Sequence, residues 1–173
     1  MSWPKFYKFP AYVVVVSLLL SGCFDENVMP LEIDAKAPPS VLTLLDGEPR
    51  EITNHPGQAQ IITFMASWCP CSNESIPLIK KVFEQYGKGE ESKIEFLMIG
   101  IQSAERKFKD IAHKWQIPFI IGYDDGDKIA RTYGITAPPT TVFVDADGVV
   151  KRVFYGNIKD KEEEFLRWTR DLL

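Results

Sequence analysis

The length, composition and charge of this 173-residue chain limit what it can be. Hydrophobic residues make up 45% of the chain and charged residues 25%, a balance typical of one compact domain with a short appendage. The formal net charge of −4 leaves no positive surplus for the phosphate backbone of a nucleic acid or for anionic lipid. The composition therefore argues against a nucleic-acid-binding protein and against purely electrostatic binding to a membrane.

The first 22 residues have the pattern of an export signal. Lys5 and Lys8 precede an apolar run over residues 11–20 that is too short to span a bilayer comfortably. Residues 20–23 (LSGC) then resemble the lipobox of bacterial lipoproteins, in which the cysteine is acylated and the chain is cut just before it. We expect residues 1–22 to be a lipoprotein signal peptide and Cys23 to carry lipid, on the periplasmic or extracellular face of a membrane. An ordinary signal peptide and an uncleaved membrane anchor are the alternatives.

The rest of the chain has the pattern of a lipid-proximal tether followed by an α/β domain. Residues 23–36 show no apolar period and are expected to form the tether, with the domain over 37–173. Strands are predicted at 41–44, 61–64 and 94–101, and a hairpin at 140–145 and 149–155. Helices are predicted where apolar residues recur at helical spacing: over 76–86, from a cap at Ser103 to Trp115, over 127–133, and from about 160 to 172.

The cysteines point to a reactive site. If Cys23 is acylated, only Cys69 and Cys71 remain free. No other cysteines are then present to form a structural disulfide. Outside the cytosol, a single pair of cysteines close in sequence more often has a redox role than a structural one. The alternative is that both are inert, buried thiols. Cys69 follows a buried strand and precedes a helix, where unpaired backbone N–H groups stabilise a thiolate. Cys69 is the predicted nucleophile, with Trp68 shielding it and Pro70 stiffening the turn.

Two segments far apart in the sequence carry a resemblance to a known family. One is residues 64–70 (FMASWCP), and the other combines residues 133–135 (YGI) with 139–145 (PTTVFVD). Together they resemble the TlpA/ResA-type membrane-anchored thioredoxin-like (redoxin) family over roughly residues 37–173. The resemblance implies a thioredoxin-like fold, in which a central mixed β-sheet is flanked by helices on both faces. It also implies thiol–disulfide exchange on exported client proteins, with a membrane or periplasmic thiol as redox partner and no cofactor.

The resemblance assigns roles to particular residues. Pro139 takes the place of the cis-proline beside the reactive cysteine, and an extended client segment would add as a strand near Thr140. Pro138, just before it, offers no N–H to a client. The expected catalytic residues are Cys69 and Cys71, and the expected client-binding residues are Trp68, Pro70, Pro138, Pro139 and Thr140.

The cysteine stretch departs from the family pattern Trp-Cys-x-Pro-Cys by one residue. An alignment without gaps keeps Cys69 and Pro77 in place and puts Ser72 where the second cysteine stands. A one-residue gap instead restores Cys71 and Glu74 to family positions at the expense of Pro77. Glu74 is a candidate proton acceptor under the second alignment, whereas the first turns it toward solvent. The sequence leaves both alignments open.

One further position bears on the mechanism. Thr63 stands six residues before Cys69, where thioredoxin-like relatives often have an acid.

The spacing of the two cysteines limits the disulfide that they can form. Cys69 and Cys71 can form a disulfide only if both precede the first helical turn, because side chains two residues apart on a helix diverge by about 200°. Such a pair would be strained and oxidising; without it, Cys69 acts as a single thiol that needs an external thiol.

Other functions of the same residues stay open. Two thiolates on either side of Pro70 would suit Cu(I), so a thioredoxin-fold metallochaperone is an alternative to an enzyme. A redox-inactive domain that only binds clients is another. No metal ligand is assigned, because His55 is expected to be a turn residue and His113 a solvated surface residue.

Overall fold

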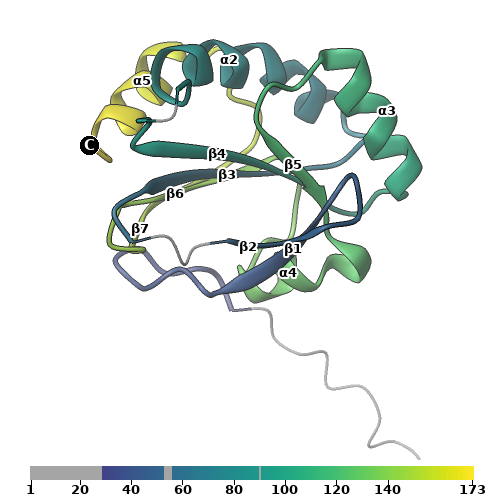
Figure 1. Cartoon of the computed structure of the whole chain (residues 1–173), viewed down its shortest axis with the longest axis horizontal. Coiled ribbons are helices and arrows are strands. Elements are labelled where there is room, and N and C mark those ends of the chain that lie inside the picture. Colours follow the sequence, from purple (N-terminus) through teal and green to yellow (C-terminus); the bar gives the residue numbers. More distant parts are fainter. Residues whose placement is uncertain (1–28, 53–55, 90) are drawn as a thin grey trace, which may run out of the picture.

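The structure is a computed structural model of the chain, and it describes residues 29–52, 56–89 and 91–173. The expected signal peptide, the lipidation site Cys23 and His55 lie outside the described residues. In the described part, one mixed sheet has the strand order β2-β1-β5-β4-β3-β6-β7. Figure 1 shows this sheet with α2, α3 and α5 above its centre and with α4 and the β1–β2 hairpin below it.

The centre of the sheet is formed by apolar strands that are buried along their whole length. β3 and β4 are parallel and buried at every position, as near-continuous hydrophobic runs in parallel sheets usually are. β5 continues the parallel set beside β4, whereas on the other side β6 pairs antiparallel with β3 and β7 pairs antiparallel with β6. The strands are β1 (Ser40–Leu44), β2 (Pro49–Ile52), β3 (Ala59–Met65), β4 (Ile94–Gly100), β5 (Ile120–Tyr123), β6 (Thr140–Val144) and β7 (Val150–Tyr155).

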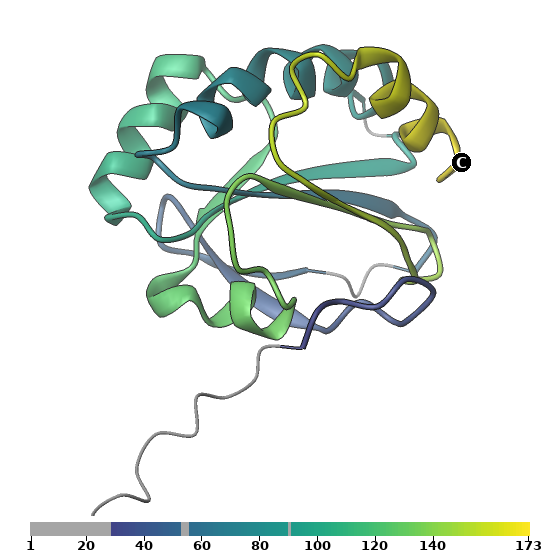
Figure 2. The same ribbon diagram turned by 180° about the vertical axis from the view of Figure 1, so that it is seen from behind.

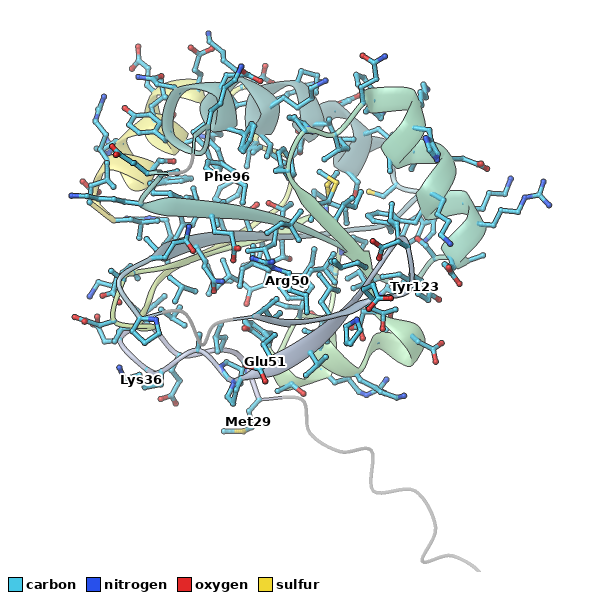
Figure 3. All side chains as sticks on the ribbon, in the orientation of Figure 1. Met29, Lys36, Arg50, Glu51, Phe96 and Tyr123 are labelled. Atoms are coloured by element: carbon cyan, nitrogen blue, oxygen red, sulfur yellow. The ribbon has the colours of Figure 1, made fainter. Side chains whose placement is uncertain are left out.

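Helices cover both faces of the sheet and bury one apolar cluster on each. On one face, Ile76 of α2, Phe108 of α3 and Phe165 of α5 pack against the sheet. On the other face, Ile129 of α4 packs with residues of β1 and β2. Figure 2 shows the same layers from behind, and Figure 3 shows the labelled Phe96 on the side of α2 and Arg50 on the opposite side. The helices are α2 (Pro70–Tyr86), α3 (Glu105–Trp115), α4 (Lys128–Thr132) and α5 (Glu162–Arg170), with a short 3-10 helix η1 (Asp125–Asp127) before α4.

The predicted elements are present, with two omissions and one wrong cap. The sequence missed β2 and β5, because residues 49–52 show no clear apolar pattern and residues 120–123 form only a short apolar run. The predicted cap at Ser103 is wrong, because α3 begins after Ala104. The Ser103 hydroxyl instead contacts the segment that leads to the cysteines.

Residues of the expected tether pack against the domain. Asp34 donates its backbone N–H to Val150 at 2.8 Å, and Val150 donates to Ala35 at 2.9 Å. Lys36 forms a β-bridge with Val149, so residues 34–37 extend the sheet at the start of β7. The last residues of the expected tether are therefore hydrogen-bonded to the folded domain. Among the described helices, none has both the length and the apolar character needed to cross a membrane.

Candidate active site

The structure places Cys69 at the junction predicted from the sequence. β3 ends at Met65, and Cys69 is the N-cap of α2 with extended backbone dihedral angles (φ −87°, ψ 115°). Its side chain is only 7% exposed, and Pro70 begins the helix at a position where the missing N–H costs nothing. The thiol therefore lies at the N-terminal end of a 17-residue helix, where the first backbone N–H groups have no partner within the helix.

The residues after Cys69 differ in burial along the first turn of α2. Ser72 is 1% exposed, and its hydroxyl accepts the backbone N–H of Ala66 at 3.2 Å. Cys71 lies in the first turn of α2 and is exposed, and both thiols are free. Pro77 is inside the same uninterrupted helix. This arrangement fits the alignment without a gap, in which buried Ser72 occupies the place of the second cysteine.

The proline loop faces the Cys69 thiol. The peptide bond between Pro138 and Pro139 is cis, as predicted for Pro139. The Cys69 sulfur lies 3.8 Å from the Pro138 carbonyl oxygen, and the Pro139 carbonyl accepts the N–H of Gly156 at 2.8 Å. The segment 136–138 is accessible at this point, while Pro139 is buried. The carbonyl of Pro138 is thus the main-chain group beside the thiol.

Thr140, a predicted client-binding residue, does not reach the accessible surface. It is 0% exposed, because β6 is an inner strand and Thr140 pairs with Phe64 on one side and Tyr155 on the other. Its hydroxyl donates to the Ala137 carbonyl at 2.6 Å. Thr140 therefore stabilises the proline loop from within, and the accessible positions are Trp68, Pro70 and Pro138.

A neutral hydroxyl pair lies beneath the site. Thr63 of β3 and Thr141 of β6 are both buried, and their hydroxyl oxygens are 3.3 Å apart. Because the two hydroxyl groups can hydrogen-bond to each other, neither requires a charged partner in the core. The position beneath the site is thus occupied by a pair that does not titrate at physiological pH.

Glu74 belongs to an exposed network on the flank of α2. Its carboxylate accepts a hydrogen bond from Lys159 at 2.8 Å and one from the side-chain amide of Asn157 at 2.7 Å. The hydrogen bond and the charge of Lys159 lower the pKa of Glu74, which makes it a weaker base. The neighbouring Ser75 is buried, and its hydroxyl lies 2.8 Å from the Cys71 carbonyl oxygen and 3.1 Å from Asn157 Oδ1. These contacts argue against Glu74 as the proton acceptor for Cys69.

The described residues give little support to a metal centre. Within 29–52, 56–89 and 91–173, no group of three or more His, Cys, Asp or Glu side chains is arranged to hold a metal ion. The two thiols do not share one environment, because Cys69 is buried and Cys71 exposed. His113 is exposed on α3, where the sequence placed it.

The sequence did not reveal that the turn after β4 belongs to the site. Gln102 accepts the indole N–H of Trp68 at 2.8 Å, and Ser103 Oγ accepts the backbone N–H of Ser67 at 2.7 Å. The place of this turn in the sequence could have indicated it, because the turn directly follows β4. Since β3 and β4 are parallel neighbours, the segments that follow them lie at the same edge of the sheet. Ser103 looked instead like a helix cap, which is the commoner use of a serine at that place.

Comparisons with known proteins agree with this geometry. The redoxin family matches residues 32–167. Thiol-disulfide oxidoreductase ResA of Bacillus cereus is 26% identical over 164 residues, which cover 89% of this chain and 92% of the relative. The relative of the same name from Halalkalibacterium halodurans is 25% identical, with 94% and 93% covered.

Solved structures show the same fold. A thioredoxin-family thiol:disulfide interchange protein from Chlorobium tepidum superposes with a TM-score of 0.69 at 23% identity, covering 82% of this chain and 97% of that one. StoA from Bacillus subtilis gives a TM-score of 0.62 at 20% identity, covering 77% and 97%. The chain therefore belongs to the redoxin family, with a thioredoxin-like fold and the enzyme class of a thiol–disulfide oxidoreductase.

Proposed function

We propose that this protein is an extracytoplasmic, lipid-anchored oxidoreductase that exchanges disulfides with exported client proteins through the single thiol of Cys69. The observation that carries the proposal is the position of that thiol. Cys69 is the N-cap residue of α2, and its sulfur lies 3.8 Å from the carbonyl oxygen of Pro138, at the accessible end of the proline loop. A nucleophile at a helix N-terminus beside a main-chain group suits attack on a disulfide held in extended conformation.

The exchange takes place in two balanced steps. The Cys69 thiolate attacks one sulfur of a client disulfide, so that a Cys69–client disulfide forms and the other client sulfur leaves as a thiolate and takes up a proton. A thiolate then attacks the mixed disulfide at the Cys69 sulfur or at the client sulfur. Attack at the client sulfur expels the Cys69 thiolate: a thiol of the same client thereby isomerises the client, and an external thiol is left in a mixed disulfide with the client. Attack at the Cys69 sulfur by an external thiol expels the client thiolate, which takes up a proton, and a second external thiol then cleaves the resulting Cys69 mixed disulfide and returns Cys69.

An external or client thiol fits the geometry of the second step better than Cys71. Cys71 is exposed in the first turn of α2, and its carbonyl is held by Ser75, so its side chain diverges from that of Cys69. A membrane-bound or periplasmic thiol partner would supply the resolving thiol, and Cys71 would tune the site rather than resolve it. The lowered basicity of Glu74 and the neutral Thr63–Thr141 pair leave solvent as the proton acceptor.

Client binding is expected at the accessible residues beside Cys69. The Pro138 carbonyl can accept one hydrogen bond from a client backbone, and the ring of Trp68, 61% exposed, offers an apolar surface. Pro138 donates none, because it has no N–H. The client is therefore bound by one main-chain acceptor and apolar contact instead of a full strand ladder.

The proposed location rests on the first 23 residues and on the relatives. The basic start, the short apolar run and the LSGC sequence ending at Cys23 fit lipidation. Metabolic labelling with an alkyne fatty acid tests this directly. The wild-type chain should be labelled at Cys23 and Cys23→Ser should not; equal labelling of both would remove the lipid anchor from the proposal.

Turnover of a peptide disulfide in the presence of glutathione tests the chemistry. Cys69→Ser should abolish turnover, because no other described thiol lies at the proline loop. Cys71→Ser should keep most of it, since an external thiol resolves the mixed disulfide. Equal activity in both variants would contradict a role for Cys69, and loss of activity in Cys71→Ser would show that Cys71 is the resolving thiol.

A further inference from the structure

The turn that follows β4 connects the separate segments around the active site. Gln102 has a left-handed backbone conformation (φ 48°), which is disfavoured for a residue with a Cβ and needs support from its surroundings. Its backbone N–H donates to the carboxylate of Asp127 at 2.7 Å. Asp127 is also left-handed (φ 55°), and it precedes α4 without capping that helix through its side chain. The carboxylate is therefore used to hold the turn.

The same turn holds the segment that carries the nucleophile. The carbonyl of Gln102 accepts the indole N–H of Trp68 at 2.8 Å, and Ser103 Oγ accepts the backbone N–H of Ser67 at 2.7 Å. Ser103 also donates to the carbonyl of Ile101 at 2.9 Å. Ser67 and Trp68 immediately precede Cys69, so the turn limits how far this segment can move relative to the sheet.

A third contact reaches the proline loop. The side-chain amide of Gln102 lies 3.4 Å from the carbonyl oxygen of Thr136, a long hydrogen bond. Thr136 is two residues before Pro138, whose carbonyl faces the Cys69 sulfur. One residue thus contacts both sides of the site, with Trp68 on one side and Thr136 on the other.

We propose that Gln102, anchored by Asp127, is a positioning residue that fixes the spacing and orientation of Trp68 and the proline loop for an extended polypeptide client. The inference rests on the proposed exchange at Cys69. Because the indole N–H is already bonded to Gln102, Trp68 presents its apolar ring to the client. A small disulfide needs only the Cys69 thiol, whereas a polypeptide must contact the two sides at once. Loosening the turn should therefore slow the polypeptide selectively.

The chain offers a closely matched control for the test. Gln116, the C-cap of α3, is also an exposed glutamine with a left-handed backbone (φ 47°). Gln102→Gly and Gln116→Gly therefore make the same chemical change in the same backbone conformation, and glycine relieves the same strain in both. Asp127→Gly removes the anchor while fitting a positive φ, and Asp127→Asn keeps a side-chain oxygen that can accept the Gln102 N–H.

The experiment compares two substrates on the full-length chain in detergent. Asp127→Gly should lower kcat/KM for an extended cystine peptide about three- to tenfold, the loss expected for one net hydrogen bond, mainly by raising KM. Gln102→Gly should lower it about two- to threefold, since its side-chain contact is long. For a small aromatic disulfide the rate constants should stay unchanged, and Gln116→Gly and Asp127→Asn should resemble the wild type with both substrates.

A second readout does not depend on activity. Solvent exchange of the Trp68 indole N–H, followed by NMR, should be faster in Asp127→Gly and unchanged in Asp127→Asn and Gln116→Gly. Unchanged indole exchange in Asp127→Gly, or equal slowing with both substrates, would overturn the positioning role while the wild type still catalysed exchange. A wild-type protein that exchanges with neither disulfide would overturn the proposed function itself.

Discussion

Replacing Ser72 by cysteine should convert the site from one reactive thiol into a redox pair. Ser72 is buried three residues after Cys69, so their directions on the helix differ by about 60°, compared with about 160° for Cys71. In Ser72→Cys, a disulfide between Cys69 and the new thiol at position 72 can therefore form with α2 intact. A Cys69–Cys71 disulfide requires the first turn to unwind.

The structure gives the size of the difference. Unwinding the first turn breaks the hydrogen bond from the Asn73 N–H to the Cys69 carbonyl (3.3 Å) and the contact of Ser75 Oγ with the Cys71 carbonyl (2.8 Å). Each contributes about 1 kcal/mol, so the smaller ring is disfavoured by about 2 kcal/mol. Since about 30 mV corresponds to 1.4 kcal/mol for a two-electron couple, the reduction potential of the disulfide between positions 69 and 72 should lie at least about 40 mV below that of Cys69–Cys71.

Redox titration of the full-length chain measures this difference. Wild type, Ser72→Cys and Ser72→Cys with Cys71→Ser are equilibrated in glutathione buffers, alkylated, and analysed by intact mass and peptide mapping. The two variants should show one reversible two-electron transition that maps to positions 69 and 72. Ser72→Ala serves as the control, and its free energy of unfolding should fall by about 1–2 kcal/mol because the buried Ala66 N–H loses its acceptor. The reasoning would be refuted if wild type formed an intramolecular disulfide at an equal or lower potential than the variants.

Three further changes have expected outcomes. Pro138→Thr supplies an N–H at the proline loop and should raise kcat/KM for a peptide disulfide about threefold or more, with little effect on a small disulfide, as steady-state assays would show. Burial raises the pKa of Asp124 from its ordinary value of 3.8, so near that pH the folded state binds more protons than the unfolded state. The free energy of unfolding should therefore fall as the pH rises above 3.8. Denaturant unfolding at a series of pH values should show no such fall for Asp124→Asn. Gly100→Ala would place its methyl group 2.5 Å from the buried Phe108 ring and should lower the free energy of unfolding by about 1–3 kcal/mol, measured in urea.

The sequence predicted the fold because the strongest patterns lie in its centre. β3 and β4 are apolar runs, and α2 begins within the cysteine stretch and carries apolar residues at helical spacing. The edge elements carry weaker signals: β2 (PREI) is stabilised by pairing with β1 and not by an apolar period. These edge strands form because they pair with neighbouring strands in the folded protein. The pattern of a single sequence does not show which strands pair.

The candidate site was predicted in part. The N-cap position of Cys69 followed from local sequence, because a strand end and a helix start are local signals, whereas the cis bond before Pro139 was implied by the family resemblance. The burial of Thr140 and the contacts of Gln102 were missed, because they depend on which strand lies next to which. The one-residue shift of the second cysteine also needed the structure, since only the observed start of α2 shows that Ser72 faces inward and Cys71 outward.

The most direct test of the central claim is to identify the cysteine that forms the mixed disulfide. The reduced full-length chain is mixed with a peptide disulfide, quenched with acid within the first turnover, and digested for mass spectrometry. The proposed function predicts a peptide adduct on Cys69 that accumulates when external thiol is omitted and disappears when glutathione is added. An adduct on Cys71 in the absence of one on Cys69, or no adduct on either cysteine, would contradict it.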